Sequence, residues 1–314
     1  MADQYDIIIV GGGPAGLTAG IYAGRAGKRV AILERELIGG QITYTNSIDN
    51  FPAAPGISGF EYAMRLQQQA ESFGAKVLMR NVTEIVPPET AGAPFRVLTA
   101  RGEYEATAVI LATGLSHRRM GIEGEDALIS RGISFCAVCD GAFFRKADVA
   151  VYGGGNTALE DAIFLSGLCN KVTIIHRRDR FRGEQQLVDE LKSKENVEFA
   201  MQKTVSAVHG DKILRSITIK DTVTGEETDL PISGLFVAIG QIPNGGIFRA
   251  IAETDERGYY LADERCETMT PGLFVAGDGR SKEIQQLTTA VSDGAVAATK
   301  ACKYVDRMNG NEYV

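Results

Sequence analysis

Residues 6–35 read DIIIVGGGPAGLTAGIYAGRAGKRVAILER, and residues 148–177 read DVAVYGGGNTALEDAIFLSGLCNKVTIIHR. Aligned without a gap, the two stretches share nine identities at an offset of 142 residues. Each contains a short β-branched run, a glycine-rich turn, a stretch of helical composition and a second β-branched run. That order is typical of a β–α–β unit whose parallel strands are buried on both faces. The repeat therefore predicts two α/β domains of the same kind.

A glycine fingerprint lies between the first strand and the helix of each copy. It is G-x-G-x-x-G at residues 11–16 and G-x-G-x-x-A at residues 153–158. The first glycine allows a tight turn, the second lets the backbone approach a pyrophosphate, and the third position permits close packing of helix on strand. The helix then presents free N–H groups and the positive end of its dipole to the phosphates. The two fingerprints predict two dinucleotide sites in Rossmann-like domains, in preference to two glycine turns that bind nothing.

The end of the second strand distinguishes the two copies. Glu34 stands there in the first copy, whereas His176 stands there in the second and is followed by Arg177, Arg178 and Arg182. A carboxylate at this place accepts hydrogen bonds from the ribose hydroxyls of FAD or NAD, whereas arginines bind the 2′-phosphate of NADPH. The alternative for the arginines is a solvated basic face or a nucleic-acid patch. The acidic chain and the position at a strand end disfavour that alternative.

Length and composition are those of an ordinary globular protein with two domains: 314 residues, 44% hydrophobic and 23% charged. The net charge of -7 argues against a general nucleic-acid binder or a protein of anionic membranes. The N-terminal residues lack the basic region of a secretory signal, and glycines interrupt the uncharged stretch 7–24, which indicates a strand and a turn rather than a membrane span. Five cysteines, only two of them close together, favour the reducing cytoplasm.

The remaining segments indicate that the second copy interrupts the domain begun by the first. Helical patterns cover residues 58–73, 184–195 and 285–305, and strand-rich segments cover residues 75–110, 197–240 and 272–278. We therefore predict a discontinuous first domain, whose fingerprint suits FAD or NAD, and an inserted second domain that suits NADPH and carries the close cysteine pair. The predicted boundaries are residues 1–115 and 246–314 for the first domain and residues 116–245 for the second.

The close cysteine pair is Cys136-Ala137-Val138-Cys139, followed by Asp140. A zinc half-site would need two more ligands, but the three histidines and the other three cysteines are well separated from one another, so no metal site is expected. Two buried structural thiols are a second alternative. A redox dithiol fits best, because this spacing lets the sulfurs close a small ring and lowers the pKa of one thiol. Asp140 is either a solvated turn residue or a general acid that protonates the departing thiolate.

These motifs together resemble those of the low-molecular-weight thioredoxin reductases over essentially the whole chain. CAVCD ahead of a second nucleotide fingerprint is highly specific for that family. The resemblance implies an α/β fold of two Rossmann-like, three-layer ββα domains, the second inserted into the first. It also implies a homodimeric flavoenzyme with one FAD and one NADPH site per chain. The matching stretches are GGGPAG at 11–16, GGQ at 39–41, NFP at 50–52, ATG at 112–114, CAVCD at 136–140, GGGNTA at 153–158, HRRDRFR at 176–182 and GLFVAGD at 272–278.

The resemblance further implies roles for individual residues. In the family the first cysteine exchanges with thioredoxin and the second lies against the flavin, so Cys136, Cys139 and Asp140 are the expected catalytic residues. One departure is Gln285-Gln286, where the family commonly has Arg-Gln, so the charge of that arginine is missing. The expected FAD contacts are Gly11, Gly13, Pro14, Ala15, Gly16, Glu34, Arg35, Gly40, Gln41, Asn50, Ala112, Thr113, Gly114, Asp278, Gln286 and Leu287. The expected NADPH contacts are Gly153, Gly155, Asn156, Thr157, Ala158, His176, Arg177, Arg178, Arg182 and Gly240.

The activity that follows is NADPH-dependent reduction of the disulfide of thioredoxin in the cytoplasm. The hydride passes from NADPH to FAD, the electrons reduce Cys136–Cys139, and the dithiol reduces the partner by thiol–disulfide exchange. Two alternatives stay open. One is a flavin dithiol oxidase or a ferredoxin-fed reductase of the same fold, and the other is a non-catalytic redox sensor. Neither a nucleic acid nor a membrane is expected as a partner.

Overall fold

Both repeated stretches form the β–α–β unit that the sequence predicts. Residues 3–45, 47–48, 50–90 and 92–311 are described by the computed structural model of the chain. The elements of the first copy are β1 (Asp3–Val10), α1 (Pro14–Arg25) and β2 (Val30–Glu34). Those of the second copy are β9 (Asp148–Gly153), α5 (Asn156–Ser166) and β10 (Lys171–His176). In each copy the two strands pair in parallel as direct neighbours.

The chain divides into two compact units, and the second interrupts the first. Unit 1 comprises Met1–Thr43, Phe51–Ser116 and Ile242–Val314, as far as these residues are described. Unit 2 comprises His117–Gln241, together with the described residues of Tyr44–Asn50. The long excursion leaves and re-enters unit 1 through β7 (Leu115–His117) and β16 (Gln241–Pro243), which pair as a two-stranded sheet.

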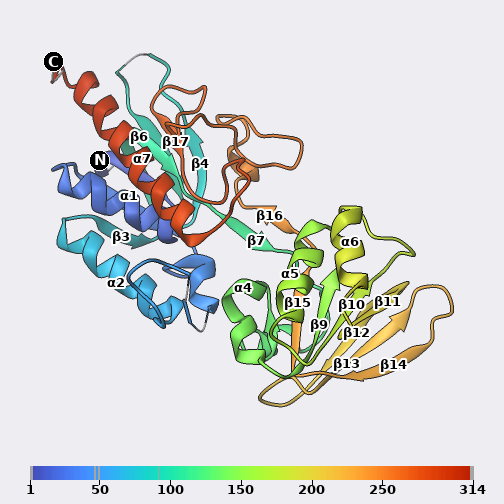
Figure 1. Cartoon of the computed structure of the whole chain (residues 1–314). Helices are drawn as coiled ribbons and strands as arrows, with labels where there is room; N and C mark the ends of the chain where they lie inside the picture. The colour runs from blue at the N-terminus through green and yellow to red at the C-terminus, as the bar shows by residue number, and fades with distance from the viewer. Residues whose placement is uncertain (1–2, 46, 49, 91, 312–314) are drawn as a thin grey trace. The chain divides into compact units, whose positions relative to one another are not determined.

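The main sheet of unit 1 has the strand order β3-β2-β1-β6-β5-β4, with β17 on the other side of β6 (Figure 1). Strands β1, β2, β3, β6 and β17 run parallel to one another, and β4 and β5 are added antiparallel. The remaining strands are β3 (Lys76–Met79), β4 (Val82–Val86), β5 (Phe95–Thr99), β6 (Gly102–Leu111) and β17 (Leu273–Val275). The strand-rich segments 75–110 and 272–278 are thereby confirmed.

Each face of this sheet has its own core, because successive side chains of a strand point to opposite faces. Ile7 and Ile9 belong to the core shared with the helices α1, α2 (Gly59–Ser72) and α7 (Leu287–Met308). Ile8 and Val10 belong to the opposite core, which contains residues of β4, β5 and the segment 248–260. The helix α7 packs on α1 so closely that a Cβ atom on Gly294 would lie 2.2 Å from the carbonyl oxygen of Ala15.

Unit 2 has three layers. Its parallel sheet has the order β11-β10-β9-β15-β8, with α5 and α6 on one face and an antiparallel sheet, β12-β13-β14, on the other (Figure 1). Unit 2 therefore has the three-layer ββα arrangement that the sequence predicts. The elements not yet located are α6 (Gln185–Lys192), β8 (Ile133–Ser134), β11 (Val197–Met201), β12 (Lys203–His209), β13 (Ser216–Asp221), β14 (Glu227–Pro231) and β15 (Gly234–Ala238).

Short elements occupy the connections. They are the helices α3 (Glu125–Leu128) and α4 (Ala137–Asp140) and the 3-10 turns η1 (Gly40–Tyr44), η2 (Gly141–Phe144) and η3 (Gly246–Phe248). None of the helices in the described part of the chain is both long enough and apolar enough to cross a membrane.

Candidate functional site

The first glycine fingerprint forms an open cradle at the start of α1. A Cβ atom on Gly11 would lie 2.2 Å from the carbonyl oxygen of Ala112, and one on Gly16 would lie 1.9 Å from that of Gly11. These two glycines therefore allow β1, α1 and β6 to approach each other. At Gly13 the nearest atom to such a Cβ is 3.8 Å away, so the turn stays open in front of the helix N-terminus. This is the geometry that a pyrophosphate requires.

Four segments expected to bind FAD meet at the carboxyl ends of β1, β6 and β17. The glycine segment 39–41 reaches the cradle, because a Cβ atom on Gly40 would lie 3.6 Å from Gly13 Cα. The segment 277–279 reaches it from the other side, where a Cβ atom on Gly277 would lie 2.8 Å from Ala15 Cβ. The residues 112–114 lie between them, next to Gly279. Ligands of open α/β sheets bind at this edge.

Glu34 ends β2 and is buried at the rim of the cradle. Its Oε2 accepts a hydrogen bond from the Gly12 N–H at 2.7 Å, and its Oε1 accepts one from the Glu36 N–H at 2.8 Å. Each carboxylate oxygen keeps a second lone pair, so the group can still accept from a ribose hydroxyl. Arg35 points elsewhere and pairs with Glu36 at 3.0 Å. The backbone contacts of Glu34 fix the carboxylate for the role that the sequence assigns to it.

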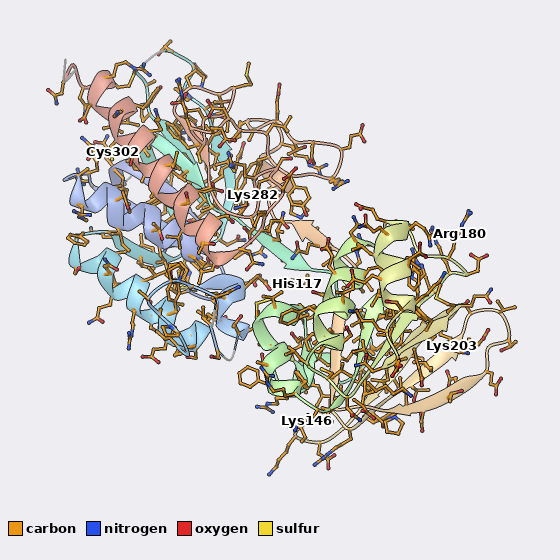
Figure 2. The ribbon with its side chains drawn as sticks, viewed as in Figure 1. His117, Lys146, Arg180, Lys203, Lys282 and Cys302 are labelled. Carbon is orange, nitrogen blue, oxygen red and sulfur yellow. A yellow bond between two sulfur atoms is a disulfide. The ribbon has the colours of Figure 1, made fainter. Side chains whose placement is uncertain are left out.

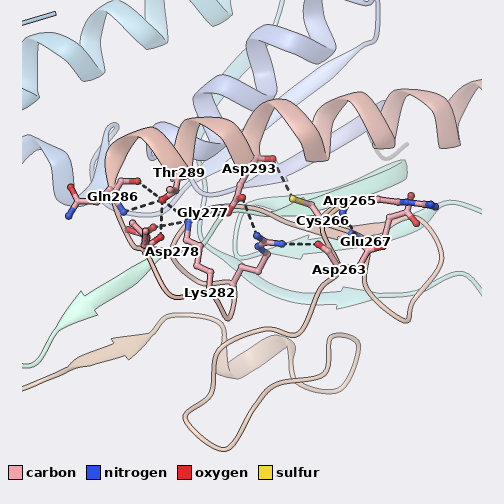
Figure 3. Close-up of polar contacts among 12 residues, drawn as sticks. Asp263, Arg265, Cys266, Glu267, Gly277, Asp278, Lys282, Gln286, Thr289 and Asp293 are labelled. Carbon is pink, nitrogen blue, oxygen red and sulfur yellow. Dashed lines mark hydrogen bonds and ion pairs between the residues drawn. The ribbon is translucent and has the colours of Figure 1, made fainter. Parts of the chain in front are cut away.

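A buried cluster of charges surrounds Asp278 (Figure 3). Lys282 Nζ lies 3.2 Å from Asp278 Oδ1 and 3.1 Å from Asp293 Oδ2, and the same Asp293 oxygen accepts a hydrogen bond from the Gly277 N–H. Arg280 contributes a second cation, 3.6 Å from Asp293 Oδ1. Burial raises the pKa of Asp278, and the charge of Lys282 opposes that rise. Asp293 and Lys282 thus hold the turn that carries Asp278, a role that no sequence motif revealed.

The donor and acceptor set of this edge fits a flavin dinucleotide. Asp278 Oδ1 is buried and accepts no hydrogen bond within the described structure, although the ammonium of Lys282 lies beside it. Such an oxygen suits a hydroxyl donor of a sugar-like chain. The open turn at Gly13 suits the pyrophosphate, and Glu34 suits the adenosine ribose. The residues present therefore fit FAD.

The start of α7 completes the set of expected FAD contacts in unit 1. Gln286 caps this helix in a reciprocal capping box with Thr289, and Leu287 is its first residue. Gln285, which stands where the family has arginine, donates from Nε2 to the Asp278 carbonyl oxygen at 3.5 Å. Asn50 falls in the short segment 44–50, which groups with unit 2 rather than with unit 1.

The second glycine fingerprint forms a comparable cradle in unit 2. A Cβ atom on Gly153 would lie 2.4 Å from the carbonyl oxygen of Ala238, whereas one on Gly155 would meet nothing within 4 Å. Asn156 begins α5 and exchanges two hydrogen bonds with Glu184, of 2.8 and 2.9 Å. Thr157 and Ala158 follow in the first helical turn, and Gly240 lies beyond the end of β15. The open turn at Gly155 is therefore available to a second pyrophosphate.

His176 supports the arginine loop from inside the protein. Its ring is buried so close to the cradle that a Cβ atom on Gly154 would lie 2.2 Å from Nδ1. The ring stacks on Phe181, and Nε2 lies 3.1 Å from the carbonyl oxygen of Arg180, which is labelled in Figure 2. Burial lowers the pKa of His176. The sequence predicted His176 as a nucleotide contact, and the structure gives the ring a position that shapes the loop.

The three arginines of this loop are exposed at the end of β10. Arg177, Arg178 and Arg182 make no ion pair with an acidic side chain of the described residues. The Arg182 N–H donates to the Gly154 carbonyl oxygen at 2.8 Å, which draws the loop against the cradle. Three uncompensated cations beside a pyrophosphate site are what recognition of a 2′-phosphate requires.

Cys136 and Cys139 form a disulfide at the start of the short helix α4. The N–H of Cys139 points at Cys136 Sγ at 3.2 Å, and the N–H of Asp140 donates to the Cys136 carbonyl oxygen. Asp140 is buried, and its Oδ2 accepts a hydrogen bond of 2.7 Å from Ser134 Oγ. The interpretation of Asp140 as a solvated turn residue is therefore wrong, because the side chain is enclosed and held by a neighbour.

The other three cysteines are free and buried in the hydrophobic cores. Burial raises the pKa of Cys169 to about 11, that of Cys266 to about 12 and that of Cys302, on α7, to about 11 (Figure 2). Thiols of this kind stay protonated and unreactive at neutral pH. Among the described residues, no group of histidine, cysteine, aspartate and glutamate side chains could hold a metal ion. Within the residues that the structure describes, Cys136 and Cys139 are thus the one pair of cysteines joined in a disulfide.

Phe135, the residue before Cys136, packs against two side chains of the segment 117–119. The ring of His117 stacks on Phe135 with 4.7 Å between centroids, and the guanidinium of Arg119 lies 5.0 Å from the same ring. Burial, helped by the charge of Arg119, lowers the pKa of His117 to about 4. The stack is therefore built on a neutral imidazole throughout the physiological range.

His117 is expected to make the protein less stable in mild acid. The unfolded chain binds this proton near pH 6.5 and the folded chain only near pH 4, so stability present above pH 6.5 is lost as the pH falls towards 4. The loss is up to about 3 kcal/mol. Thermal unfolding at pH 7.5 and pH 5.0 should show a smaller decrease in Tm for His117→Phe than for the wild type. An equal decrease in both proteins would contradict the assignment.

The family comparison matches almost the whole chain. A family model described as pyridine nucleotide-disulphide oxidoreductase matches residues 5–294. The thioredoxin reductase of Treponema pallidum is 41% identical over 309 residues, which cover 98% of this chain and 99% of the relative. The thioredoxin reductase of Listeria innocua is 40% identical over 306 residues, which cover 97% and 95% of the two chains.

The fold comparison agrees with the sequence comparison. The crystal structure of a thioredoxin reductase from Streptococcus pyogenes superposes with a TM-score of 0.90 at 40% identity. The match covers 98% of this chain and 100% of that one.

Proposed function

Because the chain belongs to the pyridine nucleotide-disulphide oxidoreductase family, and within it to the thioredoxin reductases, we propose that it reduces the disulfide of thioredoxin with electrons from NADPH. It is a flavoenzyme that uses FAD and NADPH. The observation that carries this function is the Cys136–Cys139 disulfide, followed at once by the buried Asp140, in the unit that also holds the arginine-flanked glycine cradle. The relatives reported above are all thioredoxin reductases, so the oxidase, ferredoxin-fed and sensor alternatives are not favoured.

Unit 1 supplies the FAD site in this proposal. Gly11, Gly13 and Gly16 shape the turn that receives the pyrophosphate, and the N-terminus of α1 faces its charge. Glu34 accepts hydrogen bonds from the adenosine ribose, and Asp278 accepts one from the ribityl chain. When bound, FAD supplies the two-electron transfer between NADPH and the disulfide. The other expected FAD contacts are Pro14, Ala15, Arg35, Gly40, Gln41, Asn50, Ala112, Thr113, Gly114, Gln286 and Leu287.

Unit 2 supplies the NADPH site. The turn at Gly155 and the first turn of α5 receive the pyrophosphate, and Arg177, Arg178 and Arg182 bind the 2′-phosphate. His176 keeps the backbone of the arginine loop against the cradle. The other expected contacts are Gly153, Asn156, Thr157, Ala158 and Gly240.

The two cysteines have different roles in the exchange. Cys136 forms the mixed disulfide with thioredoxin, as the resemblance to the family implies. The N–H of Cys139 points at its sulfur in the disulfide and, kept after reduction, would stabilise a thiolate there. Cys139 is the flavin-proximal cysteine, and its thiol then attacks the mixed disulfide and releases reduced thioredoxin. Asp140 holds and returns the proton that accompanies these sulfur displacements.

We propose in addition that the enzyme works as a homodimer in the cytoplasm. The resemblance to the family supports the dimer. The cysteine usage supports a reducing compartment, because only two of the five cysteines are close together in the sequence and a secreted disulfide framework would pair more of them.

The function is tested by anaerobic titration of the flavin-loaded protein. NADPH is expected to remove the oxidised flavin absorbance, and oxidised thioredoxin added next is expected to restore it with formation of thioredoxin thiols. NADH and reduced ferredoxin serve as matched donors and should remove the absorbance far more slowly. Flavin that NADPH does not bleach, or bleached flavin that thioredoxin does not reoxidise, would contradict the proposal.

A further inference from the structure

A buried serine joins Asp140 to the main chain of the redox disulfide. Ser134 Oγ donates a hydrogen bond to Asp140 Oδ2 at 2.7 Å and accepts one from the Cys136 N–H at 3.1 Å. Both side chains are enclosed, with Ser134 5% and Asp140 7% exposed. A serine has a single hydroxyl proton, and a carboxylate at 2.7 Å is a stronger acceptor than the Cys136 carbonyl oxygen at 3.3 Å. The proton therefore points at Asp140.

Ser134 is the fixed partner in this contact. It lies in β8, where it is in register with Phe236 of β15, inside the parallel sheet of unit 2. The next residue, Phe135, packs against His117 and Arg119. Asp140, in contrast, ends a helix of only four residues. The sheet thus sets the position of the hydroxyl, and the hydroxyl sets the position of the carboxyl group.

We propose that Ser134 is a positioning residue for thiol–disulfide exchange, and that its hydroxyl holds the Asp140 carboxyl group in the orientation from which it exchanges protons with the sulfur pair. The inference rests on the proposed function. The short hydrogen bond from a fixed hydroxyl favours one orientation of the carboxyl group over the others that its side-chain torsions allow. A carboxyl group held in that orientation meets the reacting sulfur in a productive geometry more often.

The step is balanced between the two proteins. The Cys136–Cys139 bond forms as the two enzyme thiols lose two electrons and two protons, and the thioredoxin disulfide breaks as it gains both. Asp140 takes one of these protons from an enzyme thiol and gives it to a departing thioredoxin thiolate, so the carboxyl group ends as it began. Ser134 neither gains nor loses a proton in this sequence.

The test is a double-mutant cycle on the flavin-loaded enzyme: wild type, Ser134→Ala, Asp140→Asn and the double variant. Ser134→Ala is expected to lower kcat for thioredoxin about 10-fold or more, with little change in KM, which is the effect of one lost hydrogen bond to a charged group. Asp140→Asn should lower kcat at least as far. The double variant should be no slower than Asp140→Asn, because Ser134 acts only through Asp140.

Three controls separate this role from a merely structural one. Ser134→Thr keeps the hydroxyl and should recover most of the lost kcat. Ser206→Ala, which removes a hydroxyl bonded to the Thr218 carbonyl oxygen on β13, should keep the wild-type kcat. Bleaching of the flavin by NADPH should keep its wild-type rate in Ser134→Ala, because that half-reaction precedes the exchange.

The proposal would be overturned if the decreases in kcat of Ser134→Ala and Asp140→Asn multiply in the double variant. An unchanged kcat in Ser134→Ala would overturn it as well. If Ser134→Thr fails to fold, the cycle alone decides. The proposed function itself would be overturned if NADPH bleaches the flavin of the wild-type enzyme and the enzyme still leaves thioredoxin oxidised. That result is visible before any variant is measured, so the two failures are distinguishable.

Discussion

Cys139→Ser is expected to trap thioredoxin as a stable mixed disulfide through Cys136 and to abolish turnover. Cys136 can still attack the thioredoxin disulfide, but no second enzyme thiol remains to resolve the product. Cys136→Ser should also lose turnover, by roughly three orders of magnitude or more, without forming the adduct. The measurement is peptide mapping of the complex formed with a thioredoxin that lacks its own resolving cysteine and whose remaining cysteine is joined by a disulfide to 2-nitro-5-thiobenzoate. Attack by Cys136 releases 2-nitro-5-thiobenzoate as the leaving thiolate.

The remaining cysteines provide the matched control. Cys169→Ala or Cys302→Ala removes a buried thiol outside the redox disulfide and should keep both turnover and the ability to form the adduct when Cys139 is replaced. A cross-link carried by Cys139 in the Cys136→Ser protein, with none through Cys136, would reverse the assignment of the two sulfurs.

The paired replacement of Arg177 and Arg178 by alanine is expected to lower kcat/KM for NADPH about 100-fold or more, mainly by raising KM. Use of NADH should change little, since that nucleotide carries no 2′-phosphate. The wild-type preference for NADPH should therefore nearly disappear. Steady-state kinetics with both nucleotides, at equal thioredoxin concentration, gives the two ratios directly.

A second pair of exposed cations in unit 2 serves as a control that distinguishes binding of the 2′-phosphate from a general effect of positive charge. Lys212 and Arg215 lie between β12 and β13, and their replacement by alanine removes the same charge from the unit. This control should keep the preference for NADPH. Equal wild-type efficiency with NADPH and NADH, or an equal loss in both double variants, would contradict a 2′-phosphate site at the arginine loop.

Much of the fold could be predicted because long, periodic segments carry it. The glycine fingerprints and the β-branched runs located β1, α1 and β2, and β9, α5 and β10, within a few residues. The helical pattern at 285–305 corresponds to α7. A buried parallel strand needs a continuous apolar run, and a nucleotide cradle needs glycine at fixed spacing. Both features can therefore be recognised in the amino-acid sequence.

Contacts between short elements could not be predicted from the sequence. The strand β8 has only two residues, so no alternation could indicate that Ser134 is fixed in a sheet. The charge cluster of Asp278 could not be predicted either, because Lys282 lies in a loop, Asp293 lies in a helix, and the two meet only after folding. The sequence placed His176 at the end of a strand. It did not indicate that the ring is buried, because the ring fits there only where Gly154 has no side chain.

The packing of α7 on α1 has a consequence for the order in which the chain is made and folds. Synthesis reaches the end of unit 2 at Gln241, whereas β17 and α7 of unit 1 follow later. Until then, the sheet face with Ile7 and Ile9 lacks one of its covering helices, and that apolar surface stays open to solvent or a chaperone. The inserted unit can therefore fold before its host. The turn at residues 11–16, although synthesised first, reaches its final packing among the last.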